Sequence, residues 1–104
     1  MLSKNGWQVF ALARSIKEVD FNDKVVKVAC DITDSSQIKS AFAQIEKQSE
    51  KIDLLISCAG RALVGPFEKQ HEQEIEDTLA VNLTGTIRLT QEIYTRMLTQ
   101  KSGQ

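Results

Sequence analysis

Short apolar runs alternate with polar stretches over the first sixty residues of the chain. Three of these runs have the length of a strand and end at a charged or small polar residue: Gln8–Arg14, Val25–Cys30 and Ile52–Ser57. Short apolar runs bounded by turn residues are typical of buried strands. We therefore predict three strands, and a helix end at Asn5-Gly6 before the first of them.

A helical period follows the second predicted strand. Asp34, with Gln37 three residues later, has the outline of a capping box, so a helix is expected to begin there. The polar residues 15–24 predict a loop or one irregular turn, and residues 68–77 favour a helix. The apolar positions after Asp34 recur at helical spacing and predict one buried face, made of Ile38, Ala41, Phe42 and Ile45.

A longer helical pattern runs from Leu79 to Leu98 and carries two apolar stripes. A helix that packs on one face of a sheet needs a single stripe about 100° wide. The extra width predicts a second partner, either another helix or another subunit. One stripe comprises Leu83, Ile87, Tyr94 and Leu98, and the other comprises Leu89, Ile93 and Met97.

The order of these elements alternates strand with helix. Such alternation predicts an α/β fold with a parallel sheet and helices on its faces. We find no repeat or linker, so a single domain over residues 1–104 is expected. The pattern alone does not indicate a function.

Charge and composition exclude several classes of protein. Thirteen basic and fourteen acidic residues give a net charge of −1, which does not fit a nucleic-acid-binding surface. No apolar run is long enough to cross a bilayer, and the N-terminus has no apolar stretch resembling a secretory signal, so we expect a cytoplasmic protein. Cys30 and Cys58 are widely spaced in apolar surroundings, which favours buried, reduced thiols over a disulfide or a metal site.

Four motifs in order give the chain a family resemblance. Residues 4–14 resemble the end of the first helix and the second strand of short-chain dehydrogenases/reductases. Cys30-Asp-Ile-Thr33 is similar to the family's D-V-T, and Ser57-Cys-Ala-Gly60 to its N-N-A-G, with serine and cysteine in place of the two asparagines. Val81-Asn-Leu-Thr-Gly85 is similar to its V-N-x-x-G. The resemblance implies a partial Rossmann-like, doubly wound parallel sheet of three strands.

The resemblance also implies a cofactor. Arg14 ends the second strand of the family, where an acid would select NAD and a basic residue accommodates the 2′-phosphate of NADP. A guanidinium offers a fixed fork of donors that suits a phosphate, and Ser15 would be a second donor. Asp31 would bond the adenine amino group, with Ile32 flanking the ring. The alternative for Arg14 is a solvated residue at a strand end. The alternative for Asp31 is a turn cap, or a share in the helix-capping role with Thr33 and Asp34.

The remaining implied site residues follow the third predicted strand and open the long helix. Ala59 and Gly60 would let the backbone approach the cofactor, although Gly60 also suits a plain turn. Asn82 matches the asparagine of the family's catalytic tetrad, which holds a water in the proton relay; alternatively, it kinks or caps the helix. No metal site is predicted.

The resemblance implies a fragment of an NADP(H)-dependent oxidoreductase acting on a carbonyl or secondary alcohol. The Gly-rich turn, the active-site serine and the Tyr-x-x-x-Lys pair have no counterpart in these residues. Tyr94 is not that tyrosine, because the residue four positions later is Leu98. We therefore expect the chain to be inactive in isolation, and homo-oligomeric through its last helix. The alternative is a non-catalytic interaction module that uses the apolar face of this helix.

Overall fold

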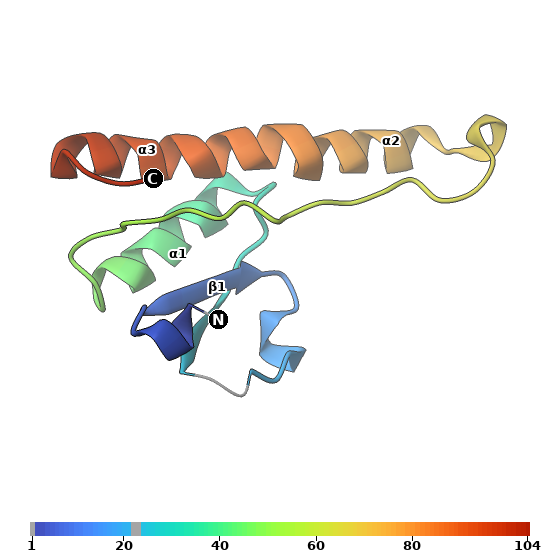
Figure 1. The fold of residues 1–104 in the computed structure, drawn as a ribbon. Coiled ribbons are helices and arrows are strands. Elements are labelled where there is room, and N and C mark those ends of the chain that lie inside the picture. Colours follow the sequence, from blue (N-terminus) through green and yellow to red (C-terminus); the bar gives the residue numbers. More distant parts are fainter. Residues whose placement is uncertain (1, 22–23) are drawn as a thin grey trace. The chain divides into compact units, whose positions relative to one another are not determined.

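The computed structural model describes residues 2–21 and 24–104, which form two compact units. The first unit contains the residues up to 31 together with 36–50, and the second contains 32–35 together with 51–104. Figure 1 shows the elements in chain order.

The first unit is built on a two-stranded parallel sheet. Strand β1 (Val9–Ala13) pairs with β2 (Val25–Ala29), in a register that sets Val9 opposite Val25 and Ala13 opposite Ala29. A 3-10 turn, η1 (Ser3–Asn5), precedes β1 and ends at Gly6, whose φ of 86° lies in the left-handed region that glycine adopts at helix ends. This confirms the predicted helix end and, within a residue or two, the first two predicted strands.

The helix of the first unit matches its predicted period. Helix α1 (Ser35–Glu46) buries the four expected residues, Ile38, Ala41, Phe42 and Ile45. Phe42, Ile38 and Val28 are the largest side chains that are less than 2 % exposed. The loop predicted for residues 15–24 contains one short turn, η2 (Ile16–Glu18), with Ile16 buried; residues 22 and 23 lie outside the described part of the chain. Burial of one helical face beside a sheet therefore accounts for this unit's core.

After residue 50 the second unit continues with an extended segment, residues 51–64, and here the prediction of a third strand at Ile52–Ser57 is wrong. Within the described residues the segment borders no other strand. Its backbone instead bonds to Gln104, whose N–H donates to Asp53 O (2.9 Å) and whose carbonyl accepts from Leu55 N–H (2.8 Å), the pattern of one parallel pairing. The sheet of the described residues thus has two strands, not three.

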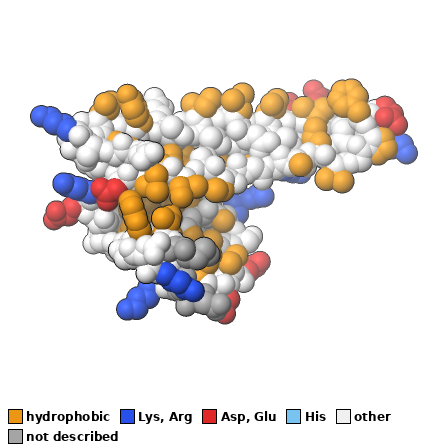
Figure 2. All heavy atoms as spheres, in the orientation of Figure 1, with side chains coloured by type: hydrophobic (Ala, Val, Ile, Leu, Met, Phe, Trp, Pro, Cys, Tyr) orange, Lys and Arg blue, Asp and Glu red, His pale blue; other side chains and the backbone are white. Residues whose placement is uncertain are grey.

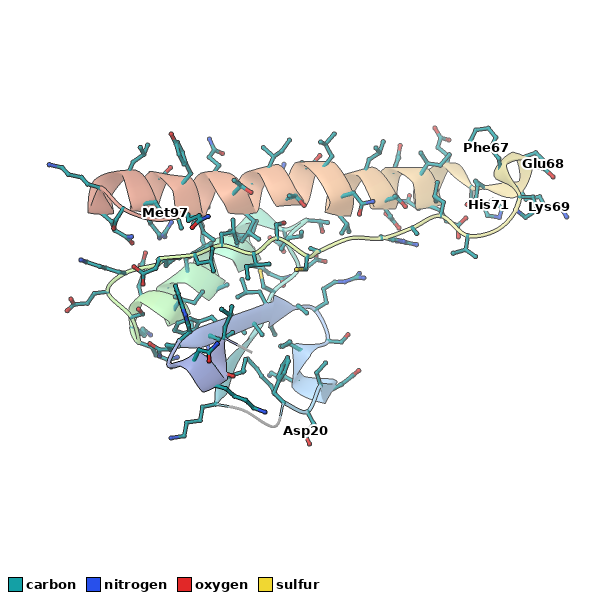
Figure 3. All side chains as sticks on the ribbon, viewed as in Figure 1. Asp20, Phe67, Glu68, Lys69, His71 and Met97 are labelled. Atoms are coloured by element: carbon teal, nitrogen blue, oxygen red, sulfur yellow. The ribbon has the colours of Figure 1, made fainter. Side chains whose placement is uncertain are left out.

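A long helical run completes the second unit. It comprises α2 (Glu72–Leu79), a π-helical turn η4 (Ala80–Gly85) and α3 (Thr86–Gln100), preceded by the 3-10 turn η3 (Phe67–Lys69). Lys101 ends α3 in the left-handed region (φ 59°), and the tail returns toward Met97, labelled in Figure 3. The predicted helix over Leu79–Leu98 is present, but its regular period is interrupted at Ala80–Gly85.

The two apolar stripes of this run differ in exposure. Leu89 and Ile93 are 7 % and 6 % exposed. The residues of the other stripe, by contrast, are more than half exposed, and Figure 2 shows hydrophobic side chains along one side of the helical run. The name outer stripe is used here for Leu83, Ile87, Tyr94 and Leu98 together with Leu79, which precedes them in the run and is also more than half exposed. Within the second unit, the outer stripe therefore has no packing partner among the described residues.

Cys30 and Cys58 are both free thiols, but only Cys30 is buried. The prediction of burial is therefore wrong for Cys58, which is exposed in the extended segment. Among the described residues no helix is both long and apolar enough to span a membrane.

Candidate functional site

Arg14, Ser15 and Asp31 lie at one edge of the first unit's sheet. Ala13 is opposite Ala29, and the N–H of Cys30 donates to Ala13 O (3.1 Å), so pairing continues to the carboxyl ends of both strands. Arg14 and Ser15 follow β1 directly, while Asp31 comes two residues after β2. In parallel α/β sheets, ligands bind beyond these carboxyl ends. The structure thus brings together three of the predicted residues.

The three residues at this edge differ in exposure and in hydrogen bonding. Arg14 is exposed and makes no hydrogen bond or ion pair with the described residues, so its donors are available to a ligand. Ser15 is exposed too, and its carbonyl accepts the N–H of Glu18 (3.1 Å) to close η2. Asp31 is partly buried, and its N–H donates to Gln37 Oε1 (2.9 Å). Gln37, predicted as part of a capping box, therefore ties Asp31 to the first turn of α1.

The other predicted residues belong to the second unit. Ile32 is 8 % exposed, which leaves only a small part of its side chain to flank a ring. It packs against Gly85, where an added Cβ would lie 2.8 Å from Ile32 Cγ1 and 2.9 Å from the oxygens of Ile32 and Ala80. Contacts this short exclude any side chain without movement of the backbone. The glycine of the V-N-x-x-G motif is thus required by the close approach of Ile32 to the π turn.

Asn82 lies within that π turn, and its side chain pairs with the backbone of Arg61. Its Oδ1 accepts from Arg61 N–H and its Nδ2 donates to Arg61 O, both at 2.6 Å. The amide thereby satisfies both backbone groups of one residue in an extended segment that has no strand neighbour there. Single π turns are rare and frequently occur at functional sites. The structure places Asn82 where the helix is least regular.

Ala59 and Gly60 directly precede Arg61, the residue that bonds to Asn82. Both are exposed, and an added Cβ at Gly60 would meet only Asn82 Oδ1, at 3.8 Å, which is an ordinary contact. The backbone of these two residues is therefore accessible, as the predicted close approach of a cofactor requires. Within its own unit, Gly60 is adjacent to Asn82, so two of the predicted residues are neighbours here.

Sequence analysis missed the polar residues that hold the extended segment to the helical run. Arg61 Nη1 lies 3.3 Å from Asp77 Oδ2, while Gln100 donates to Ile52 O (2.9 Å) and accepts from Ile52 N–H (3.0 Å). These partners are 16 and 48 residues apart, and no local pattern marks them. Among the described residues, no group of three or more His, Cys, Asp or Glu side chains could hold a metal ion.

The chain is similar to several curated proteins. Two curated relatives are D-threitol dehydrogenase of Mycolicibacterium smegmatis, 35% identical over 72% of this chain, and 3-ketodihydrosphingosine reductase of Dictyostelium discoideum, 37% identical over 78% of it. The matched regions are 29% and 25% of those proteins, so the chain spans less than a third of their length.

Solved structures show the same fold. A short-chain dehydrogenase from Streptomyces avermitilis superposes on 98% of this chain with a TM-score of 0.84 and 28% identity, over 39% of its own chain. A variant of actinorhodin polyketide ketoreductase, solved with NADPH, gives a TM-score of 0.86 at 24% identity, covering 98% of this chain and 43% of its own. The fold is therefore Rossmann-like α/β. All residues from 1 to 104 match the family described as short chain dehydrogenase, and the chain belongs to that family.

Proposed function

We propose that this chain is the adenine-side part of the cofactor-binding domain of an NADP(H)-dependent oxidoreductase, which interconverts a carbonyl and a secondary alcohol. The observation that carries the proposal is the exposed Arg14 at the carboxyl end of β1, beside the end of β2. A cation at this position favours the 2′-phosphate of NADP, whereas an acid favours the ribose hydroxyls of NAD.

The residues at this edge fit the cofactor chemically. The unengaged guanidinium of Arg14 can donate two hydrogen bonds to one phosphate, and the Ser15 hydroxyl can donate a third. The carboxylate of Asp31 can accept from the adenine amino group, and Gln37 holds its backbone in place. In the second unit, the accessible backbone of Ala59 and Gly60 would contact the cofactor. Bound NADPH would supply the hydride.

Asn82 is the one residue of the family's catalytic group that the motifs match in this chain. Its side-chain amide is engaged with Arg61, so its part is to hold the π turn and the loop after Gly60 together around the relay water. The sequence contains one tyrosine, Tyr94, without a lysine four residues later. With no Tyr-x-x-x-Lys pair to donate a proton to a carbonyl, the isolated chain is proposed to be inactive.

The names of several relatives agree with a carbonyl or secondary-alcohol substrate. They include a D-threitol dehydrogenase, 3-ketodihydrosphingosine reductases and the 3-oxoacyl-[acyl-carrier-protein] reductase MabA of Mycobacterium tuberculosis. The carbon skeletons in these names differ widely. We therefore propose the reaction class for this chain and no particular substrate.

Replacing Arg14 by alanine tests the cofactor assignment. The variant should lose about 1–3 kcal/mol of NADP affinity, the range for losing charged hydrogen bonds, while NAD affinity stays nearly unchanged. Titration of each nucleotide by NMR or calorimetry measures both. Lys39→Ala, which removes an exposed cation from α1 of the same unit, is the control and should alter neither affinity. An equal loss for NADP and NAD in Arg14→Ala would contradict the assignment.

A second candidate function is protein association through the outer stripe. The observation that favours it is the exposure of Leu83, Ile87, Tyr94 and Leu98, each between 55 % and 60 %. Contiguous exposed apolar patches of this kind mark interaction sites. We propose that the partner is a second copy of this chain, which keeps the cofactor assignment. Association without any nucleotide affinity would instead favour a non-catalytic interaction module.

Ile87→Lys tests this association. A lysine ammonium in the middle of an apolar contact would have to be desolvated, so the variant should be monomeric at micromolar concentrations at which the wild-type chain is oligomeric. Sedimentation velocity measures the change. Gln91→Lys adds the same charge at an exposed polar position of α3 and should leave the oligomer intact. A compact monomer in the wild-type chain would refute the proposal.

A further inference from the structure

Arg61 bonds to the helical run of its unit both through its backbone and through its side chain. Its backbone N–H and carbonyl both pair with the amide of Asn82, at 2.6 Å each. Its guanidinium Nη1 lies 3.3 Å from Asp77 Oδ2 in α2, and the other oxygen of Asp77 accepts from Gln73 Nε2 at 2.8 Å. One residue of the extended segment thus bonds to consecutive turns of the helical run.

The spacing of these two attachment points depends on the π turn. Asp77 and Asn82 are five residues apart, and at 100° per residue an unbroken α-helix would direct them about 140° apart. A π turn contains more residues than an α turn, so η4 brings Asn82 round toward the side of Asp77. Both can then reach the same residue. A helix that relaxed to regular α geometry would move Asn82 away from Arg61.

Two other contacts also hold the π turn in this conformation. The hydroxyl of Thr86 donates to Val81 O five residues earlier, at 3.2 Å. Gly85 leaves room for Ile32 on the same turn. Neither contact involves the extended segment. The link between the π turn and the loop that follows Gly60 is made by Arg61.

We propose that Arg61 is a positioning residue: its ion pair with Asp77 holds the π turn in register and so fixes Asn82 against the loop that follows Gly60. An arginine suits this task because its long side chain reaches α2 while its backbone stays paired with Asn82. The effect of this register on catalysis rests on the proposed function. The conformation of the π turn does not depend on the proposed function, and it can be measured without a nucleotide.

Amide hydrogen exchange on the 104-residue chain tests the proposal. In Arg61→Gln, the amides of residues 80–85 should exchange about two- to fivefold faster, the size expected for losing one exposed ion pair. Residues 89–97 of α3 should be unaffected. Asp77→Asn, which keeps the shape of the side chain, should reproduce the pattern. Arg96→Gln is the control, because it removes the Arg96–Glu92 pair (2.8 Å) within α3, and it should leave exchange at residues 80–85 unchanged.

A charge-swapped double variant distinguishes a positioning role of Arg61 from a general loss of stability. The charge-swapped double variant, Arg61→Asp with Asp77→Arg, should return exchange at residues 80–85 to within about twofold of wild type, because the pair is restored in reverse. High salt should speed exchange in the wild type and have little effect in Arg61→Gln. Unchanged exchange in Arg61→Gln, equal acceleration throughout α2 and α3, or failure of the swap to rescue would each overturn the proposal. None of these results depends on whether NADP binds.

Discussion

Gly85→Ala should lower the free energy of unfolding of the second unit by about 1–3 kcal/mol, the usual cost of forcing extra atoms into a closely packed site. The new Cβ would lie 2.8 Å from Ile32 Cγ1 and 2.9 Å from two backbone oxygens. Backbone atoms cannot rotate out of the way as a flexible side chain can. The π turn must therefore shift, and Asn82 is expected to move with it.

Denaturant unfolding followed by circular dichroism at 222 nm measures this loss, because α2, η4 and α3 contain most of the helical residues of the chain. Gly60→Ala is the matched control. The same substitution there places Cβ 3.8 Å from its nearest neighbour, Asn82 Oδ1, and should change stability by less than about 0.5 kcal/mol. Equal midpoints for Gly85→Ala and the wild type would show that the turn can relax without cost.

Phe42→Ala should be the most damaging substitution in the first unit, with a loss of about 3–5 kcal/mol. Phe42 is 1 % exposed in the face of α1 that also buries Ile38 and Ile45. Removing its ring deletes apolar burial and leaves a cavity. The unit has a small core, so such a loss is a large part of the 5–15 kcal/mol typical of a whole domain.

The single tryptophan, Trp7, lies in the first unit and reports on its unfolding by fluorescence. Phe67→Ala is the matched control, because Phe67 is 86 % exposed at the tip seen in Figure 3 and should change stability by less than about 0.5 kcal/mol. Similar losses for the two phenylalanines would contradict the assignment of Phe42 to the core.

The first unit could largely be predicted from the sequence because its elements are determined locally. The period of Ile38, Ala41, Phe42 and Ile45 identified the buried face of α1, and the apolar runs identified β1 and β2. The resemblance placed Arg14, Ser15 and Asp31 at strand ends, and the parallel register confirms that these ends adjoin. The binding roles of these residues remain predictions.

The second unit was predicted less well because its contacts are distant in sequence. The run Ile52–Ser57 has the composition of a strand, but a strand also needs a neighbour, and composition cannot supply one. The motif Val81–Gly85 located the turn that contains Asn82 without revealing its π geometry, since an interrupted helix keeps nearly the same apolar pattern. The bonds of Arg61 to Asp77 and of Gln100 to Ile52 depend on the fold alone.

We propose that the carboxyl end of β1 in this chain selects a 2′-phosphate. NMR titration of the wild-type chain with adenosine 2′,5′-bisphosphate and, separately, with 5′-AMP tests it most directly, because the two probes differ only in that phosphate. We predict that the bisphosphate binds more tightly by about 1–3 kcal/mol, with the largest shifts at the amides of Arg14, Ser15 and Asp31. Equal affinities for the two probes, or shifts confined to other residues, would contradict the account.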